Sequence, residues 1–145
     1  MNQVAILYPV FVQVLLTLVV YGLLLSARGR ALRAANRARG NPDLAMGRFA
    51  WPDGAQKVAN NQRNQFELPV LFYAVVAFAL IVRGADLLMV ILAWAFVITR
   101  IVHAAIHIGP NKVRWRGPAF TAGVIILLVM WVKLLLHVVT RGIVA

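Results

Sequence analysis

The chain has 145 residues, of which 62% are apolar, and its mean hydropathy is +0.82. This composition is too apolar for a soluble domain, and the length suits one domain, which we expect to span residues 1–145. The absence of cysteine excludes a disulfide framework and any thiol nucleophile of the protein's own.

Four apolar stretches follow one another along the chain, each long enough, or nearly so, to cross about 30 Å of hydrocarbon. The first, residues 4–25, is uncharged, and an Ala- and Arg-rich segment extends it as a helix toward residue 39. No basic side chain precedes it, so we expect it to remain in the mature protein rather than to be cleaved as a signal peptide. A turn at residues 40–43 and an interfacial loop at 46–54 come next.

A helix resumes at Ala55 and leads into the second apolar stretch, residues 68–82, which a tight turn at 83–86 joins to the third, residues 87–108. The fourth, residues 119–139, is expected to begin with Pro118 in its first helical turn. Lys133 and His137, near its outer end, are expected to extend to the interface. The pattern predicts an all-α membrane protein with an up-down bundle of four transmembrane helices.

The net charge of +11 is distributed unevenly over the connecting segments. Eight basic residues lie between the first and second stretches and three between the third and fourth, whereas the other side has only Arg83 and Arg141. The positive-inside rule therefore predicts cytoplasmic basic loops and both termini outside the cytoplasm. We expect no nucleic-acid binding, because no aromatic platform is interleaved with the basic residues.

Two polar stripes interrupt the apolar stretches. On helices, the members of each stripe share one face: the first stripe is Asn60, Asn64 and Glu67, and the second is Arg100, His103 and His107. Both belong to the cytoplasmic half, since Arg100 lies about 12 Å along its helix from the cytoplasmic end. Ionisable groups at membrane depth are costly unless they are paired or hydrated, so we expect the stripes to converge on one functional pocket.

The same residues also permit purely structural roles. Glu67 could pair with Arg63, four residues earlier on the same helix, or with Arg100 as a clamp between two helices. His103 and His107 have the spacing of a metal or haem ligand pair, although no carboxylate or cysteine set accompanies them, so no metal site is predicted.

At the first stripe the sequence resembles the MAPEG family, the membrane-associated proteins of eicosanoid and glutathione metabolism. Members share a stretch of the form Arg-x-Gln/His-x-Asn-x-x-Glu, followed shortly by proline, at the start of the second span. Residues 60–69 here read Asn-Asn-Gln-Arg-Asn-Gln-Phe-Glu-Leu-Pro. Gln62, Asn64 and Glu67 match this motif, and Asn60 stands in the place of the arginine.

The resemblance extends to the third and fourth spans. Members have an arginine in the third span, followed at one-turn spacings by an aromatic residue or histidine and often by a tyrosine. Arg100 and His103 match the first two positions, and His107 stands in the place of the tyrosine. Arg116, just before Gly117-Pro118, falls where several members place the arginine that lowers the pKa of a thiol.

The resemblance implies a bacterial-type member in the inner membrane, a homotrimer with cytoplasm-facing glutathione sites between neighbouring subunits. Glu67 would accept a hydrogen bond from the α-amino group of glutathione, and Asn64 would hold a nearby polar group. Arg100 would pair with a glutathione carboxylate, and Arg116 would stabilise the reactive thiolate. The remaining ligand-binding residues would be Asn60, Gln62, His103 and His107.

The predicted function is a glutathione-dependent transferase or peroxidase, with glutathione as co-substrate and a hydrophobic electrophile that arrives laterally from the lipid. The alternative is a non-catalytic protein of the same fold that binds lipid or serves as an accessory subunit of a larger membrane complex, since one family branch presents lipid substrates without transferase activity. The sequence leaves open whether Arg28 and Arg30 take part in the site or only set the topology.

Overall fold

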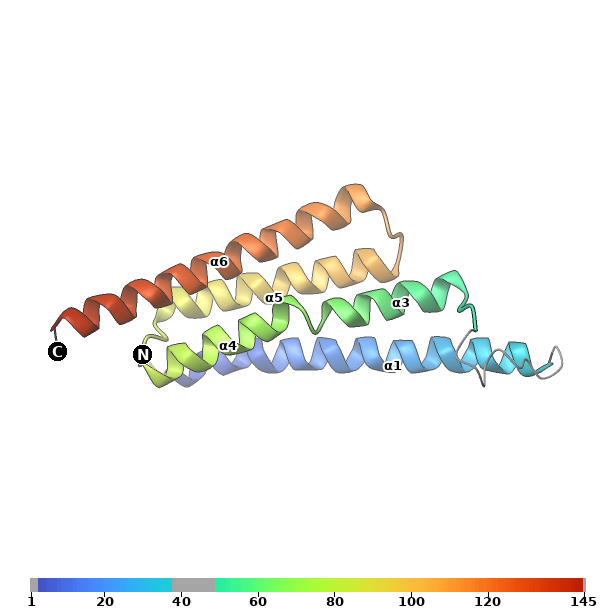
Figure 1. Ribbon diagram of the computed structural model, residues 1–145, viewed down its shortest axis with the longest axis horizontal. Helices are drawn as coiled ribbons and strands as arrows, with labels where there is room; N and C mark the ends of the chain where they lie inside the picture. The colour runs from blue at the N-terminus through green and yellow to red at the C-terminus, as the bar shows by residue number, and fades with distance from the viewer. Residues whose placement is uncertain (1–2, 38–48, 145) are drawn as a thin grey trace.

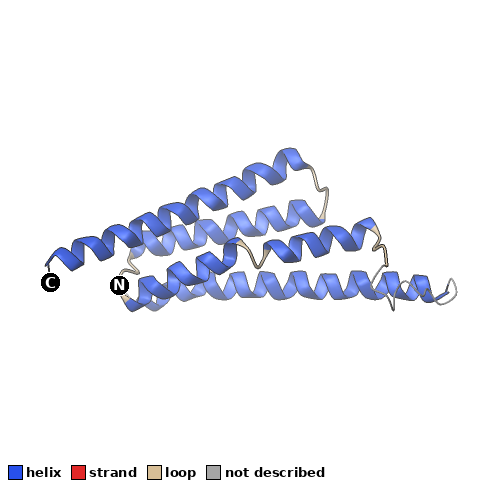
Figure 2. Cartoon of the chain, viewed as in Figure 1, coloured by secondary structure: helices blue, strands red, loops and turns tan. Residues whose placement is uncertain are grey.

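The computed structural model describes residues 3–37 and 49–144, which fold into helices joined by short turns (Figures 1 and 2). The elements are the 3-10 turn η1 (Gln3–Ile6) and the helices α1 (Leu7–Arg37), α3 (Asp53–Asn64), α4 (Leu68–Ile81), α5 (Leu87–Ile108) and α6 (Val113–Val144). With α3 and α4 counted as one broken span, four helices are long and apolar enough to cross a membrane. This confirms the predicted all-α architecture for the described residues; the predicted turn at 40–43 lies outside them.

The helices run up and down, so the connections collect at two ends of the bundle (Figure 1). The N-terminus, the C-terminus and the α4–α5 turn lie at one end, here called the terminal end. The C-terminal part of α1, the start of α3 and the α5–α6 connection lie at the other. We call this second end the basic end because it holds Arg28, Arg30, Lys112 and Arg114.

The core of the bundle combines aromatic rings with small side chains. Phe72 of α4 stacks on Phe96 of α5, with ring centroids 4.6 Å apart and an interplanar angle of 17°. Ala79 and Ala93 are fully buried, and such small residues let membrane helices approach closely. Large apolar side chains on the outside, which suit contact with lipid, are more than half exposed, for example Leu18, Ile98 and Leu128.

The second span is not one continuous helix. Helix α3 ends at Asn64, and α4 begins at Leu68 with Pro69 in its first turn. Pro69 has no N–H, and in a continuous helix its ring would clash with the carbonyl of Gln65, so the helix stops and restarts. The prediction of one uninterrupted helical face for the first stripe is therefore wrong for Glu67, which lies in the break with φ −96° and ψ −92°.

The fourth span begins earlier than the sequence pattern indicated. Helix α6 starts at Val113, and Pro118 lies inside it rather than in its first turn. Pro118 cannot donate to the carbonyl of Arg114, but the residues before it still form helix. As a consequence, Arg116 is held on a helix at the basic end rather than on a loop.

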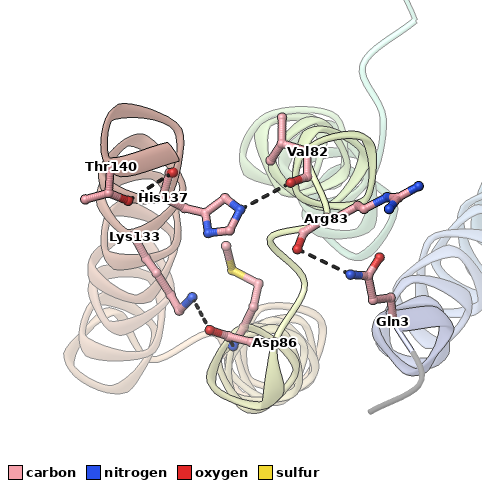
Figure 3. A network of polar contacts seen from close by, with 8 residues as sticks. Gln3, Val82, Arg83, Asp86, Lys133, His137 and Thr140 are labelled. Atoms are coloured by element: carbon pink, nitrogen blue, oxygen red, sulfur yellow. Dashed lines mark hydrogen bonds and ion pairs between the residues drawn. The ribbon is translucent and has the colours of Figure 1, made fainter. Parts of the chain in front are cut away.

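A set of polar contacts joins α6 to the α4–α5 turn at the terminal end (Figure 3). Lys133 Nζ lies 2.6 Å from Asp86 Oδ2, and Asp86 Oδ1 accepts a hydrogen bond of 2.9 Å from the backbone N–H of Met89, which caps α5. Lys133 therefore forms an ion pair with Asp86 of the same chain, and the prediction that it extends to the interface is wrong. Within the part of the chain that the structure describes, this is the only salt bridge.

His137, which also lies on α6, makes a second contact with the same turn. Its Nε2 lies 3.2 Å from the carbonyl oxygen of Val82, to which it donates a hydrogen bond (Figure 3). A Cβ at Gly84 would lie 2.9 Å from the His137 ring, so only glycine fits beneath it without a shift. The carbonyl of the next turn residue, Arg83, accepts from Gln3 at 3.3 Å, which attaches the N-terminal turn η1 as well.

Asp86 gives the terminal end a dependence on pH. Partial burial alone would raise the pKa of its carboxyl group. The Lys133 ammonium and the Met89 N–H lower this pKa by a larger amount, so it lies below its usual value. The carboxylate then contributes stability above the unfolded-state pKa of about 3.9, and this contribution is lost as the pH falls through the folded-state pKa. We expect the melting temperature of D86N in detergent to be below wild type at pH 6 and to converge with it toward pH 3.

Asparagine also caps helices, so D86N removes the charge and retains the cap. D53N is the matched control, because Asp53 is an exposed acidic residue without a salt bridge in the described structure. An equal difference in melting temperature between D86N and wild type at pH 6 and at pH 3 would contradict the role of the ion pair.

Candidate functional site

A cavity of about 370 Å³ lies toward the basic end, between α3, the break before α4, α5 and the start of α6. Its lining includes six residues predicted from the sequence: Asn60, Asn64, Glu67, His103, His107 and Arg116. Val113, Gly117 and Phe120 complete the wall. The first stripe and the two histidines of the second therefore line one cavity, and the early start of α6 adds Arg116 to it.

Arg100 is completely buried beside this cavity and does not line it. Its Nη2 donates a hydrogen bond of 3.1 Å to the backbone carbonyl of Asn64. In a continuous helix that carbonyl would bond to the N–H of Leu68, four residues on, so the helix break frees it for Arg100. Neither predicted partner of Glu67, Arg63 or Arg100, forms an ion pair with it in the described structure.

The burial of the Arg100 guanidinium is energetically unfavourable. Its Nε and Nη1 are buried without a hydrogen-bond partner, and its guanidinium carbon lies 5.8 Å from the centroid of the Phe120 ring. An arginine near the centre of a membrane helix costs about 2.5–3.5 kcal/mol on insertion scales. Buried polar groups without partners are uncommon in proteins and call for an explanation, and here the group lies directly behind the cavity.

The side-chain amide of Asn64 lies between the two histidines of α5. Its Nδ2 is 3.4 Å from His103 Nε2 and also 3.4 Å from His107 Nδ1. The other ring nitrogen of His103, Nδ1, lies 3.3 Å from the backbone carbonyl oxygen of Arg116 on α6. Asn64 thus links α3 to α5, and His103 links α5 to α6.

The remaining polar side chains of the cavity differ in how firmly they are held. Arg116 is partly buried and donates from Nη1 to Asn111 Oδ1 at 2.8 Å. Asn60 is exposed and accepts from Gln56 at 3.0 Å. The carboxylate of Glu67 is exposed and has no hydrogen bond within the described residues.

Three residues that the sequence analysis considered for the site, Gln62, Arg28 and Arg30, do not line this cavity. Gln62 does not line the cavity, although it matches the family motif. Arg28 lies over the ring of Trp51, with 4.8 Å between its guanidinium carbon and the ring centroid. Arg30 lines a separate cavity of about 490 Å³ between α1, α3 and the end of α5.

Sequence reasoning missed a buried chain of amides next to the helix break. Gln13 Nε2, from α1, donates to Gln65 Oε1 at 3.0 Å, and Gln65 Nε2 donates to Asn61 Oδ1 at 3.2 Å. All three residues are at most 1% exposed. A signal was present, since Gln13 is the polar amide in the middle of an uncharged apolar stretch.

The histidines do not belong to a metal centre in the described structure. No group of three or more His, Cys, Asp or Glu side chains comes close enough there to hold a metal ion.

The family model of the MAPEG family matches residues 6–136. The chain belongs to the MAPEG family. Comparisons with curated proteins and with solved structures gave no match. The match extends into all four spans and includes every residue that lines the cavity, and the family as a whole is associated with glutathione-related transferases, peroxidases and related roles.

A close contact between α5 and α6 behind the cavity yields a testable prediction. A Cβ at Gly123 would lie 2.9 Å from Thr99 Oγ1 and 3.9 Å from Arg100 Cδ. Thr99 cannot easily turn away, since it is stiff at χ1 and its hydroxyl donates to the carbonyl of Phe96 at 2.6 Å. We expect G123A to lower the melting temperature in the wild-type background through overpacking.

In the T99A background the same G123A change should be neutral or stabilising. The obstructing hydroxyl is then absent, and alanine is favoured over glycine in a helix by about 1 kcal/mol. Thermal unfolding of the four proteins in one detergent measures this double-mutant cycle. Destabilisation of equal size in both backgrounds would show that α6 does not approach Thr99 in this way.

Proposed function

We propose that this protein is a membrane-bound, glutathione-dependent transferase or peroxidase that acts on hydrophobic electrophiles. The observation that carries the proposal is the convergence of Asn64, Glu67 and Arg116, from three separate segments, on one cavity in a chain of the MAPEG family. The cavity volume of about 370 Å³ is within the usual range for small-molecule sites.

The residues of the cavity match the chemistry of a thiol tripeptide. The free carboxylate of Glu67 suits the α-amino group of glutathione, and the Asn64 amide oxygen is a free acceptor for a neighbouring polar group. Arg116 carries a fixed positive charge that favours a thiolate over a thiol. Arg100 acts from behind, through its hydrogen bond to Asn64 and through its charge, which together with Arg116 attracts an anionic peptide.

The assembly and orientation form part of the same proposal. The chain would act as a homotrimer in a bacterial inner membrane, with the basic end in the cytoplasm and both termini outside it. The described basic residues Arg28, Arg30, Lys112 and Arg114 support this orientation, because they lie at the end of the bundle toward which the cavity lies. The sites would lie between neighbouring subunits, and the electrophile would enter from the lipid.

Thermal unfolding of the detergent-purified protein during a glutathione titration tests the binding. A ligand that binds only the folded protein stabilises it by about 2.7 kcal/mol at a hundredfold excess over Kd. We expect a saturable rise in melting temperature with glutathione and with an S-alkyl glutathione, and its loss in E67A. The control is R63A, which removes another exposed charge four residues before Glu67. A flat wild-type titration up to several millimolar would overturn the proposal.

Arg116 is tested by the rate of conjugation. The removal of one charge-stabilising donor from an active site typically lowers a rate by about 10²–10³-fold. We expect R116A to lose activity on this scale with a standard aromatic electrophile, and the ultraviolet absorbance of bound thiolate should disappear. The neighbouring exposed arginine provides the control, R114A, which should remain near wild type. Equal losses in both variants would contradict a specific role for Arg116.

The non-catalytic alternative has one structural observation in its favour. An apolar groove of about 290 Å³ lies between α4 and α6 near the terminal end, with Phe78, Trp131 and Leu134 in its walls. Such a groove suits an acyl chain and not a polar tripeptide. Native mass spectrometry distinguishes the two functions, because retained glycerolipid without any glutathione adduct would favour lipid binding.

A further inference from the structure

The two histidines beside Asn64 have hydrogen-bond geometries that define where their protons lie. A neutral imidazole has one N–H donor and one acceptor nitrogen. His103 Nδ1 faces the carbonyl oxygen of Arg116, which can only accept, so this nitrogen must carry the proton. His103 Nε2 is then an acceptor, which matches the Asn64 Nδ2 donor opposite it.

The same amide determines the tautomer of His107. Asn64 Nδ2 has two hydrogens, and its second contact is with His107 Nδ1. Since Nδ1 accepts this hydrogen bond, the proton of a neutral His107 lies on Nε2. That nitrogen has no hydrogen-bond partner among the described residues and is not one of the fully enclosed atoms, and His107 lines the cavity.

The opposite orientation of the amide is inconsistent with the charges nearby. With its oxygen toward the rings, Asn64 would accept from both, and His103 would carry protons on both nitrogens. The resulting imidazolium would be placed close to two cations, Arg100 and Arg116, and the one carboxylate of the cavity, Glu67, forms no salt bridge with it in the described structure. Like charges that are this close repel, and little solvent screens them because His103 and His107 are only 2% and 4% exposed as residues.

We propose that Asn64 is a positioning residue that holds His103 and His107 as neutral, opposite tautomers, and that His107 presents its Nε2–H to the cavity as a hydrogen-bond donor for the bound ligand. The chemical class of that ligand, an anionic thiol peptide, rests on the proposed function. The tautomers rest on the geometry alone. The groups that face the pair are the arginines at 100 and 116, the Glu67 carboxylate and the Phe120 ring.

The arrangement explains why an amide rather than a carboxylate stands at position 64. The amide –NH₂ can donate to two acceptor nitrogens at once without carrying a charge, whereas an aspartate carboxylate could only accept. The donor that results at His107 is neutral and fixed in direction. It therefore adds specificity for an oxygen or sulfur acceptor without adding another cation to a site that already contains Arg116.

Nitrogen-15 NMR of histidine-labelled protein in lipid nanodiscs tests the tautomers without any ligand. Long-range proton–nitrogen correlations distinguish Nδ1–H, Nε2–H and doubly protonated rings. The chain has three histidines, which H137Q and H103Q assign. At pH 7 we expect His103 solely as Nδ1–H, which is the minor form of free histidine, and His107 solely as Nε2–H. A tautomer mixture at either ring would overturn the proposal.

The variant N64D gives a second test. If Asn64 had only a structural role, the substitution would leave the protonation of His103 and His107 unchanged. The introduced carboxylate accepts hydrogen bonds from the nitrogens that face it, so His103 should become doubly protonated and His107 should change to Nδ1–H. Unchanged spectra in folded N64D would contradict the assignment of Asn64. The wild-type spectrum decides the tautomers even if N64D does not fold.

The donor role of His107 is tested with two substitutions of the same residue. H107Q retains an N–H donor, whereas H107L has none. We expect H107L to weaken glutathione binding roughly two- to tenfold in the thermal titration, and H107Q to retain most of the affinity. Equal affinities in H107L and wild type would overturn the donor role. If wild type itself fails to bind glutathione, the proposed function is overturned, and the NMR spectra still decide the tautomers.

Discussion

The arrangement around the cavity depends on the break between α3 and α4. Pro69 cannot continue the helix, and the turn before it leaves the carbonyl of Asn64 without its helical partner. Arg100 of α5 satisfies this carbonyl from a completely buried position. This one interaction therefore joins the two spans at the helix break and holds the backbone of the residue whose side chain contacts both histidines.

Several polar amide side chains are buried near this interaction. Gln13, Asn61 and Gln65 form their own chain of hydrogen bonds on the α1 side of the break, and atoms at both ends of that chain have no partner. Unsatisfied groups of this kind reduce stability in a membrane interior. Farther toward the terminal end, the stacked rings of Phe72 and Phe96 join α4 to α5, and the ion pair of Asp86 with Lys133 joins the α4–α5 turn to α6.

The proposed activity and the tautomers of the histidine pair describe two aspects of one site. Arg116 contributes a charge through its side chain and an acceptor for His103 through its backbone carbonyl. In the proposed function, the same residue combines a role toward the ligand with a role in the placement of the His103 ring. A chain that carries Asn60 and His107 at positions where other family members have arginine and tyrosine can, on this basis, retain a directed donor in the cavity.

The sequence by itself determined the four spans, the clustering of basic residues at one end and the identity of most cavity residues, because apolar runs and helical spacing are local properties. Its motifs at residues 60–69 and 100–107 indicated the MAPEG family, whose model matches residues 6–136. Tertiary structure alone decided that Arg100 binds a carbonyl rather than Glu67, that Gln13 is buried against Gln65, and that Lys133 and His137 fasten the α4–α5 turn. These choices depend on which buried groups meet across helices, and no spacing within one helix specifies the partner on another.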